Sequence, residues 1–135
     1  MAVALDSNVV VGFLDRSDPL HDAADRAIRD LLATQQLFVS VITYAEVLTG
    51  ARLGHHDEDQ VMGFFADLIS RILPVDVAIA DRAAGLRAAA KALQMPDALI
   101  VASAELDPQV DLLLSGDRDV AKLKGLDCPV DLLSP

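Results

Sequence analysis

The chain opens with Met1-Ala2-Val3-Ala4-Leu5-Asp6, a short apolar run that ends in an acidic residue. An apolar run of this length predicts a buried strand, as in the centre of a parallel sheet. Further runs of the same kind recur along the chain, with helical patterns between them. The predicted strands are Ala2–Leu5, Leu37–Val41, Ile72–Val77, Val110–Leu114 and Val130–Leu133.

The segments between these runs have the spacing of helices that bury one face. The clearest pattern, at i, i+3, i+4, i+7 spacing, consists of Val61, Phe64, Phe65, Leu68, Ile69 and Ile72. Other helices are predicted over Val9–Leu14, His21–Leu32, Ala78–Leu93 and from Pro96 through Ala104. Alternating strands and helices predict an α/β fold, with a central parallel sheet flanked by helices on both faces. We expect a single domain over residues 1–135, and strand order cannot be read from periodicity.

Composition and charge narrow the class of protein. The net charge is −10, from 11 Lys and Arg against 21 Asp and Glu, which argues against broad, non-specific binding to nucleic acid. It leaves room for a phosphate substrate held by a metal. Cys128 is the only cysteine, so neither an internal disulfide nor a cysteine-rich metal cage is possible. No signal-peptide pattern follows Met1, and no apolar run approaches the roughly 20 residues needed to span a bilayer. We therefore expect a cytoplasmic protein with no membrane contact.

Four acidic residues are predicted to gather at one edge of this sheet. Asp6 ends the first strand, Asp117 follows the fourth, and Glu46 and Asp97 are expected in the first turns of helices. Ligands of open α/β sheets bind at the carboxyl ends of the strands and the adjoining helix starts. Carboxylates placed together repel one another unless a cation neutralises them. The pattern therefore predicts a hard divalent metal and chemistry on phosphate.

Each of these residues also has a structural interpretation. Asp6 could be a turn or N-cap residue, and Thr43-Tyr44-Ala45-Glu46 matches a capping box. Asp97 would be stabilised by the positive end of a helix dipole. Asp117 fits an ordinary Gly-Asp turn, and Asp119 could replace it as a ligand or cap the short helix that follows. The conjunction of all of them at one sheet edge favours the metal site.

Four segments resemble the motifs of PIN-domain nucleases, and best those of the VapC toxins of bacterial type II toxin–antitoxin systems. In chain order these segments are Leu5–Val9, Ile42–Gly50, Pro96–Ala102 and Ser115–Asp119. The resemblance spans nearly the whole chain, and the motifs occur in the right order. One departure is Val120, which stands where an aromatic residue often follows the second Asp of the last motif.

The resemblance implies a toxin that is an Mg²⁺-dependent endoribonuclease, with Mn²⁺ able to substitute, and that hydrolyses RNA phosphodiester bonds by metal-activated water. The implied partners are an RNA substrate, a second copy in a homodimer, and a VapB-like antitoxin whose C-terminal segment fills the acidic site and a neighbouring groove. The resemblance assigns metal binding and catalysis to Asp6, Glu46, Asp97 and Asp117. It assigns supporting polar roles to Ser7, Asn8, Thr43 and Ser115. Asp119 is a further supporting candidate, because it lies two positions after Asp117.

Other cationic, histidine and cysteine side chains are weaker candidates for the functional site. Cations that could guide RNA near the predicted edge are Arg52, Arg118, Lys122 and Lys124, although each alone resembles a solvated surface residue. His21, His55 and His56 fall away from that edge and are poor candidates for acid–base work. Cys128 is expected to pack as a small side chain, since no histidine partner is suggested for it.

Three other functions share part of the pattern. A phosphatase of the haloacid dehalogenase class needs a second Asp two residues after the first, where this chain has Asn8. A receiver-like, Mg²⁺-dependent phosphotransfer domain needs an early acidic pair and a late Lys that the sequence does not place. A non-catalytic α/β module that binds RNA or protein remains the main alternative, although the intact acidic set argues against it.

Overall fold

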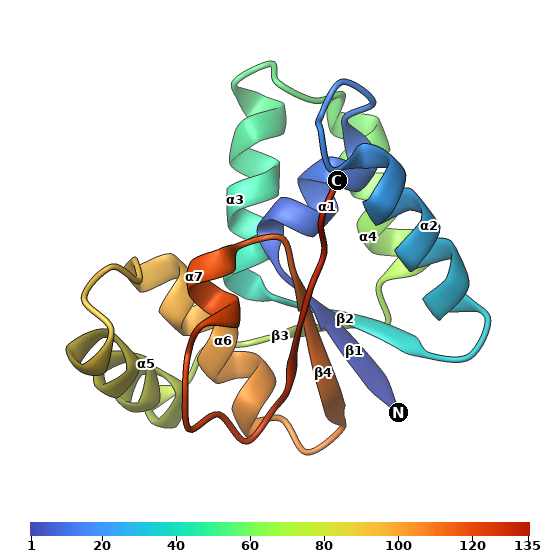
Figure 1. The fold of residues 1–135 in the computed structure, drawn as a ribbon. Helices are drawn as coiled ribbons and strands as arrows, with labels where there is room; N and C mark the ends of the chain where they lie inside the picture. Colours follow the sequence, from blue (N-terminus) through green and yellow to red (C-terminus); the bar gives the residue numbers. More distant parts are fainter.

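In the computed structural model, which describes residues 1–135, five parallel strands form one sheet with helices on both faces (Figure 1). The strands are β1 (Ala2–Leu5), β2 (Gln36–Ser40), β3 (Arg71–Leu73), β4 (Val110–Ser115) and β5 (Val130–Leu132). The helices are α1 (Ser7–Leu14), α2 (His21–Leu32), α3 (Val41–Arg52), α4 (Glu58–Leu68), α5 (Val77–Ala89), α6 (Met95–Leu106) and α7 (Arg118–Ala121). The predicted α/β class is confirmed. No helix is long and apolar enough to cross a membrane.

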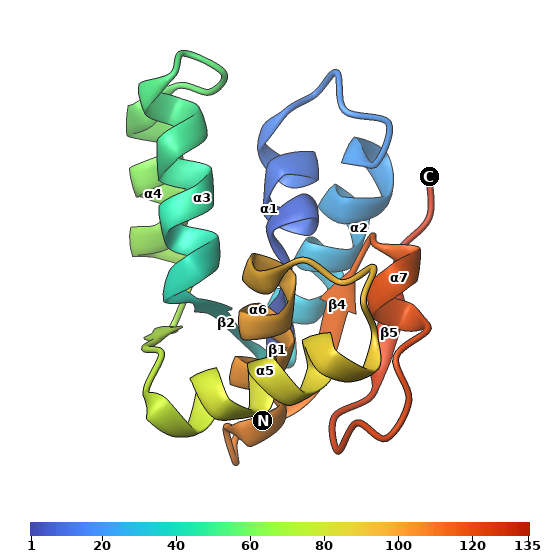
Figure 2. The ribbon, with the colours of Figure 1, turned by 90° about the vertical axis from the view of Figure 1, so that its left-hand side faces the viewer.

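Two hydrophobic cores lie on opposite faces of the sheet, because successive side chains of a strand point to opposite sides. Val3 and Leu5 of β1 pack in one core with residues of α1, α2, α3 and α4. Ala4 of β1 and Leu113 of β4 pack in the other core with residues of α5, α6 and α7. Figure 2 shows these two helical groups in separate parts of the molecule. Strands covered on both faces explain why the first run is apolar throughout.

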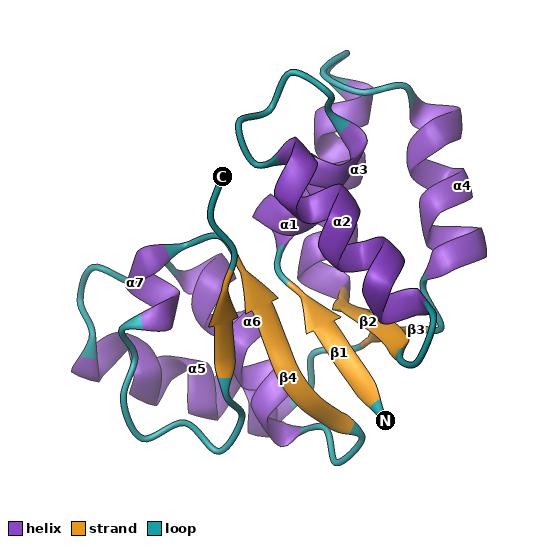
Figure 3. Cartoon of the chain, turned by 45° about the vertical axis from the view of Figure 1, so that its right-hand side comes forward, coloured by secondary structure: helices purple, strands orange, loops and turns teal.

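The strand order is β3-β2-β1-β4-β5, which places a topological switch point between β1 and β4. The chain builds outward from β1 to β3 and then returns to the other side of β1. Figure 3 shows β1 and β4 side by side, with their arrowheads at the same end. Leu5 pairs with Leu114, and the Asp6 amide donates to the Leu114 carbonyl over 2.9 Å. The loops after β1 and β4 diverge from this point, where open α/β sheets bind their ligands.

Several predicted boundaries are wrong by a few residues. Val41 begins α3, because the Ser40 hydroxyl caps that helix. The strand predicted to reach Val77 ends at Leu73, because Pro74 has no amide hydrogen for the ladder. Ile72 lies in β3, so the helix that precedes it ends at Leu68. The helix predicted through Leu93 ends at Ala89.

Candidate functional site

Asp6 lies at the end of β1 and is almost completely buried, with 1% of its surface exposed. It is the N-cap of α1, and its Oδ1 accepts a hydrogen bond from the Ser7 amide over 2.7 Å. Its Oδ2 accepts from the Ser115 hydroxyl, also over 2.7 Å. The predicted N-cap role is therefore confirmed, and it places the carboxylate at the switch point. Two donors hold that carboxylate in one orientation.

The loop after β4 is tied to the loop after β1 by two further hydrogen bonds. Ser115 Oγ accepts from the Asp117 amide over 3.0 Å while it donates to Asp6. Asn8 Oδ1 accepts from the Gly116 amide over 2.8 Å. The predicted supporting residues Asn8 and Ser115 therefore join the two strand ends. Asn8 and Gly116 are separated by 108 positions, so no local spacing could have indicated their contact.

Asp117 is the N-cap of α7, and its Oδ1 accepts from the Asp119 amide over 2.8 Å. Asp119 therefore does not cap this helix, which excludes one of the two roles that the sequence left open for it, and its role as a ligand stays a prediction. Its side chain is exposed and contributes to the negative field at Asp97. Asp117 is half-buried, so its second oxygen remains available to a ligand.

Glu46 does not belong to a capping box. Ser40 is the N-cap of α3, with its Oγ accepting from the Ile42 amide over 3.1 Å. Glu46 therefore lies in the second turn of α3 and not in the first, where the sequence had placed it. The Ser7 hydroxyl is 2.7 Å from Glu46 Oε1 and 3.1 Å from Thr43 Oγ1. Because Ser7 has one hydroxyl hydrogen, it donates to the carboxylate, and Thr43 donates to Ser7.

Asp97 lies in the first turn of α6, with Gln94 as the N-cap and Pro96 in the first turn, as predicted. Burial is the largest cause that raises the pKa of its carboxyl group to about 6. The negative charges of Asp6, Asp117, Glu46 and Asp119 raise it further, in that order. The structure therefore brings all four predicted acidic residues, and Asp119, within electrostatic range of one another.

No positive side chain forms an ion pair with these acidic residues. Burial raises the pKa of Asp6 as well, against the opposing effect of its two hydrogen-bond donors. Asp117 and Glu46 add to the increase. The ion pairs of the protein all lie elsewhere, at Arg29–Asp25, Arg52–Glu58, Arg71–Asp107 and Arg82–Glu105. An unpaired cluster of this kind attracts a cation.

The donor set fits a hard divalent cation in chemistry and in charge, because Mg²⁺ and Mn²⁺ prefer carboxylate oxygens. No three acidic, histidine or cysteine side chains of the protein stand close enough together to chelate one ion as they are placed. Binding by three of these carboxylates at once therefore requires side-chain movement. Glu46 is exposed and Asp97 and Asp117 are half-buried, so they have room to move.

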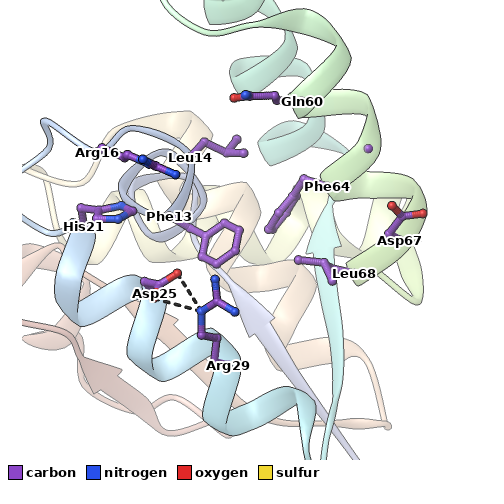
Figure 4. A pocket seen from close by; sticks show the side chains of 11 residues that line it. Phe13, Leu14, Arg16, His21, Asp25, Arg29, Gln60, Phe64, Asp67 and Leu68 are labelled. Atoms are coloured by element: carbon purple, nitrogen blue, oxygen red, sulfur yellow. Dashed lines mark hydrogen bonds and ion pairs between the residues drawn. The ribbon is translucent and has the colours of Figure 1, made fainter.

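The largest hollow, of about 890 Å³, lies away from the acidic residues, between α1, α2 and α4 (Figure 4). Phe13 and Phe64 face each other there with ring centroids 5.4 Å apart. The histidines also lie outside the acidic site: His21 contacts the Gly12 carbonyl over 2.8 Å, and the other two lie between α3 and α4. Cys128 is buried, and burial raises the pKa of its thiol. It packs as predicted.

Comparisons with known proteins agree with this architecture. The family model for the PIN domain matches residues 3–126. A comparison with curated protein sequences found no match. Among solved structures, a toxin–antitoxin complex from Klebsiella pneumoniae is 27% identical, with a TM-score of 0.71 and coverage of 96% of this chain and 95% of the other.

Two more distant structures share the fold. VapBC2 from Rickettsia felis, bound to a promoter DNA fragment, matches at 14% identity with a TM-score of 0.76, over 98% of both chains. VapC20 from Mycobacterium tuberculosis, a toxin that cleaves the sarcin–ricin loop, matches at 14% identity with a TM-score of 0.71, over 94% of this chain and 98% of the other. The family match covers most of the sequence and includes Asp6, Glu46, Asp97 and Asp117. The chain therefore belongs to the PIN-domain family.

Proposed function

We propose that this chain is a metal-dependent endoribonuclease that acts as the toxin of a toxin–antitoxin pair. The observation that carries the proposal is the acidic site itself. Asp6, Glu46, Asp97 and Asp117 act on one another electrostatically at the switch point of the sheet, and no ion pair neutralises them. Carboxylates with perturbed pKa values that are held together in this way are typical of functional sites, where a bound ligand compensates their charge.

Mg²⁺ is the proposed cofactor, with Mn²⁺ as a substitute, and these four carboxylates would hold it. When bound, such an ion supplies a nucleophile at neutral pH and neutralises charge on the phosphate oxygens. Asp6 is the fixed member of the set, since two donors orient it. Ser7 restrains Glu46. Asp97 and Asp117 are more accessible and would orient the attacking water.

The finer parts of the proposal rest on similarity to named complexes. The Klebsiella pneumoniae structure is described as a toxin–antitoxin complex, and VapC20 as a toxin that cleaves the sarcin–ricin loop. These descriptions support RNA as the substrate and a VapB-like antitoxin as the partner. We propose in addition that the chain acts in the cytoplasm, as one domain over residues 1–135, and as a homodimer.

The test is cleavage of total bacterial RNA by purified protein from which any copurified partner has been removed. New 5′ ends would be mapped with Mg²⁺, with EDTA, and with Asp6→Asn beside the wild type. Asp57→Asn is the matched control, because Asp57 is also an N-cap aspartate, at the start of α4 and outside the acidic site. We expect discrete ends that need both metal and Asp6 and that survive Asp57→Asn.

The same experiment separates the alternative function. A folded, partner-free protein that yields no metal-dependent ends from any RNA pool would point to a non-catalytic module that binds RNA or protein. Equal cleavage by Asp6→Asn and wild type would show that Asp6 has no role in catalysis.

A further inference from the structure

All three lysines of the protein line one hollow. Lys91, Lys122 and Lys124 are the only lysines in a chain of net charge −10, and they border a hollow of about 370 Å³ between α5 and α7. All three are exposed, and none takes part in an ion pair. Figure 2 shows the end of α5 and the loop after it beside α7. Three unpaired positive charges therefore border one hollow.

The hollow adjoins the acidic site. Asp119 lines it and is also one of the charges that raise the pKa of Asp97. The chain connectivity leads to the same place, since Lys122 is the C-cap of α7, the helix that Asp117 caps at its other end. Lys91 lies in the loop that leads from α5 into α6, only six positions before Asp97. A ligand that occupies the acidic site can thus continue into the hollow.

The floor of the hollow is aliphatic. Leu86 and Leu93 are buried, Leu123 is half-buried, and no aromatic side chain lines the cavity. A rim of lysines over an aliphatic floor suits a ligand that carries phosphates on one side and an apolar face on the other. A nucleotide has this character, since its base has a flat apolar face and its phosphate binds the point charge of a lysine.

We propose that this hollow is a binding subsite for single-stranded RNA beside the acidic site, an inference that rests on the proposed function. The three lysines contact phosphates of the strand next to the bond that is cut, and a base lies over the three leucines. The lysines also supply positive charge to a strand that the acidic site alone would repel. This arrangement reconciles a protein of pI about 4.4 with a polyanionic substrate.

The experiment measures binding and not cleavage. A fluorescent single-stranded RNA of about 12 nucleotides is titrated with full-length Asp97→Asn protein, in Mg²⁺, at several salt concentrations. The triple variant Lys91→Gln, Lys122→Gln, Lys124→Gln should bind about tenfold or more weakly at low salt. Its log–log salt slope should fall by about 2, because each phosphate contact on a single strand contributes roughly 0.7.

The control variant removes three positive charges elsewhere, by Arg16→Gln, Arg26→Gln and Arg29→Gln, at exposed positions in the loop after α1 and on α2. It should keep the affinity and the salt slope of the parent. An equal loss in both variants would show an effect of net charge alone and overturn the subsite. A ribose-phosphate oligomer without bases should bind the parent protein several-fold more weakly than the RNA does. Equal binding of the two oligomers would show that no base contacts the three leucines.

An acidic peptide is the alternative ligand for this hollow. A polyglutamate peptide of equal length that binds more tightly than RNA, through the same lysines, would assign the hollow to an acidic protein segment instead. The proposed function is tested apart from the subsite. Wild-type protein that binds RNA through the lysines without cutting contradicts the nuclease alone, and lysine-independent binding by an active nuclease contradicts the subsite alone.

Discussion

The Ser115 hydroxyl donates a hydrogen bond to Asp6 Oδ2 over 2.7 Å, which joins the ends of β4 and β1 across 109 positions of the sequence. Both side chains are buried, with exposures of 0% and 1%. The same hydroxyl accepts from the Asp117 amide over 3.0 Å. One oxygen atom therefore positions two of the proposed metal ligands, and it lowers the pKa of Asp6 against the effect of burial.

Ser115→Ala should impair both stability and catalysis. It leaves a buried carboxylate oxygen and the Asp117 amide without their partner, a loss that costs about 1–3 kcal/mol. The pKa of Asp6 should rise further, so that the cost grows as pH increases. RNA cleavage should fall about 10–100-fold, as is typical when a group that orients a ligand is removed. Chemical denaturation and single-turnover cleavage measure the two effects.

The matched control is Ser103→Ala. Ser103 is also buried, at 2% exposure, and donates to the Leu99 carbonyl within α6 over 2.7 Å. Its replacement should change stability modestly and leave the rate of cleavage intact. Equal losses of activity in the two variants would show that Ser115 acts only through stability.

Asp97→Asn should stabilise the metal-free protein at neutral pH. The pKa of Asp97 is about 6 in the fold, above the ordinary value of 3.8, so the folded state favours the protonated form. Its favourable contribution is fully present below pH 4 and is lost as pH rises through 6. At pH 7 the asparagine variant should therefore gain about 1 kcal/mol, an amount reduced from the full effect because the side chain is partly exposed. Thermal melts in EDTA from pH 3.5 to 7.5 test this.

The pH profile gives the control for this prediction. Wild type and Asp97→Asn should melt at similar temperatures near pH 3.5 and diverge between pH 4 and 7. A constant difference across that range would exclude ionisation of Asp97 as the cause. The variant should also lose RNA cleavage, so that higher stability accompanies lower activity, as expected where like charges are held together for function.

Divalent metal should reverse the repulsion. Mn²⁺ or Mg²⁺ that binds the folded state alone stabilises it by about 2.7 kcal/mol at a concentration 100 times its dissociation constant. The melting temperature of the wild type should therefore rise with either ion, and that of Asp6→Asn should rise much less. Asp57→Asn, at the start of α4, should respond like the wild type. Equal shifts in all three proteins would place the metal outside the acidic site.

Much of this site follows from local patterns in the sequence. Asp6 and Asp117 could be placed because each follows an apolar run that forms a strand, and Asp97 because Pro96 marks a helix start. Glu46 was placed one turn too early. Ser40 and Thr43 both have capping side chains, and tertiary structure selects Ser40, whose position at the end of β2 starts the helix sooner.

Other features depend on contacts that local patterns do not contain. The order of the strands sets the switch point, and the Asn8–Gly116 bond joins distant segments. The sequence does not indicate a role for Lys91, because the predicted helix continues through Leu93, where a lysine resembles a solvated side chain. In the structure that helix ends at Ala89, and Lys91 lines the hollow between α5 and α7. Because α5 ends four residues earlier than predicted, Lys91 lies in a loop and not on a helix surface.

Glu46→Gln distinguishes a metal ligand from a structural hydrogen-bond acceptor. The amide oxygen of glutamine can still accept from the Ser7 hydroxyl, which lies 2.7 Å from Glu46 Oε1. Stability should therefore change by less than about 0.5 kcal/mol, as for other exposed positions. Glutamine has no charge for a divalent ion, so cleavage should fall and the concentration of Mg²⁺ needed for activity should rise.

Ser7→Ala should give the complementary result. It removes the only side-chain partner of Thr43, which is fully buried, so stability should fall by about 1–2 kcal/mol. Glu46 keeps its charge in this variant, so added Mg²⁺ should restore more cleavage in Ser7→Ala than in Glu46→Gln. Measuring the rate against Mg²⁺ concentration in both variants separates the two roles. Full activity in Glu46→Gln at low Mg²⁺ would leave Glu46 as a hydrogen-bond acceptor and reduce the metal site to Asp6, Asp97 and Asp117.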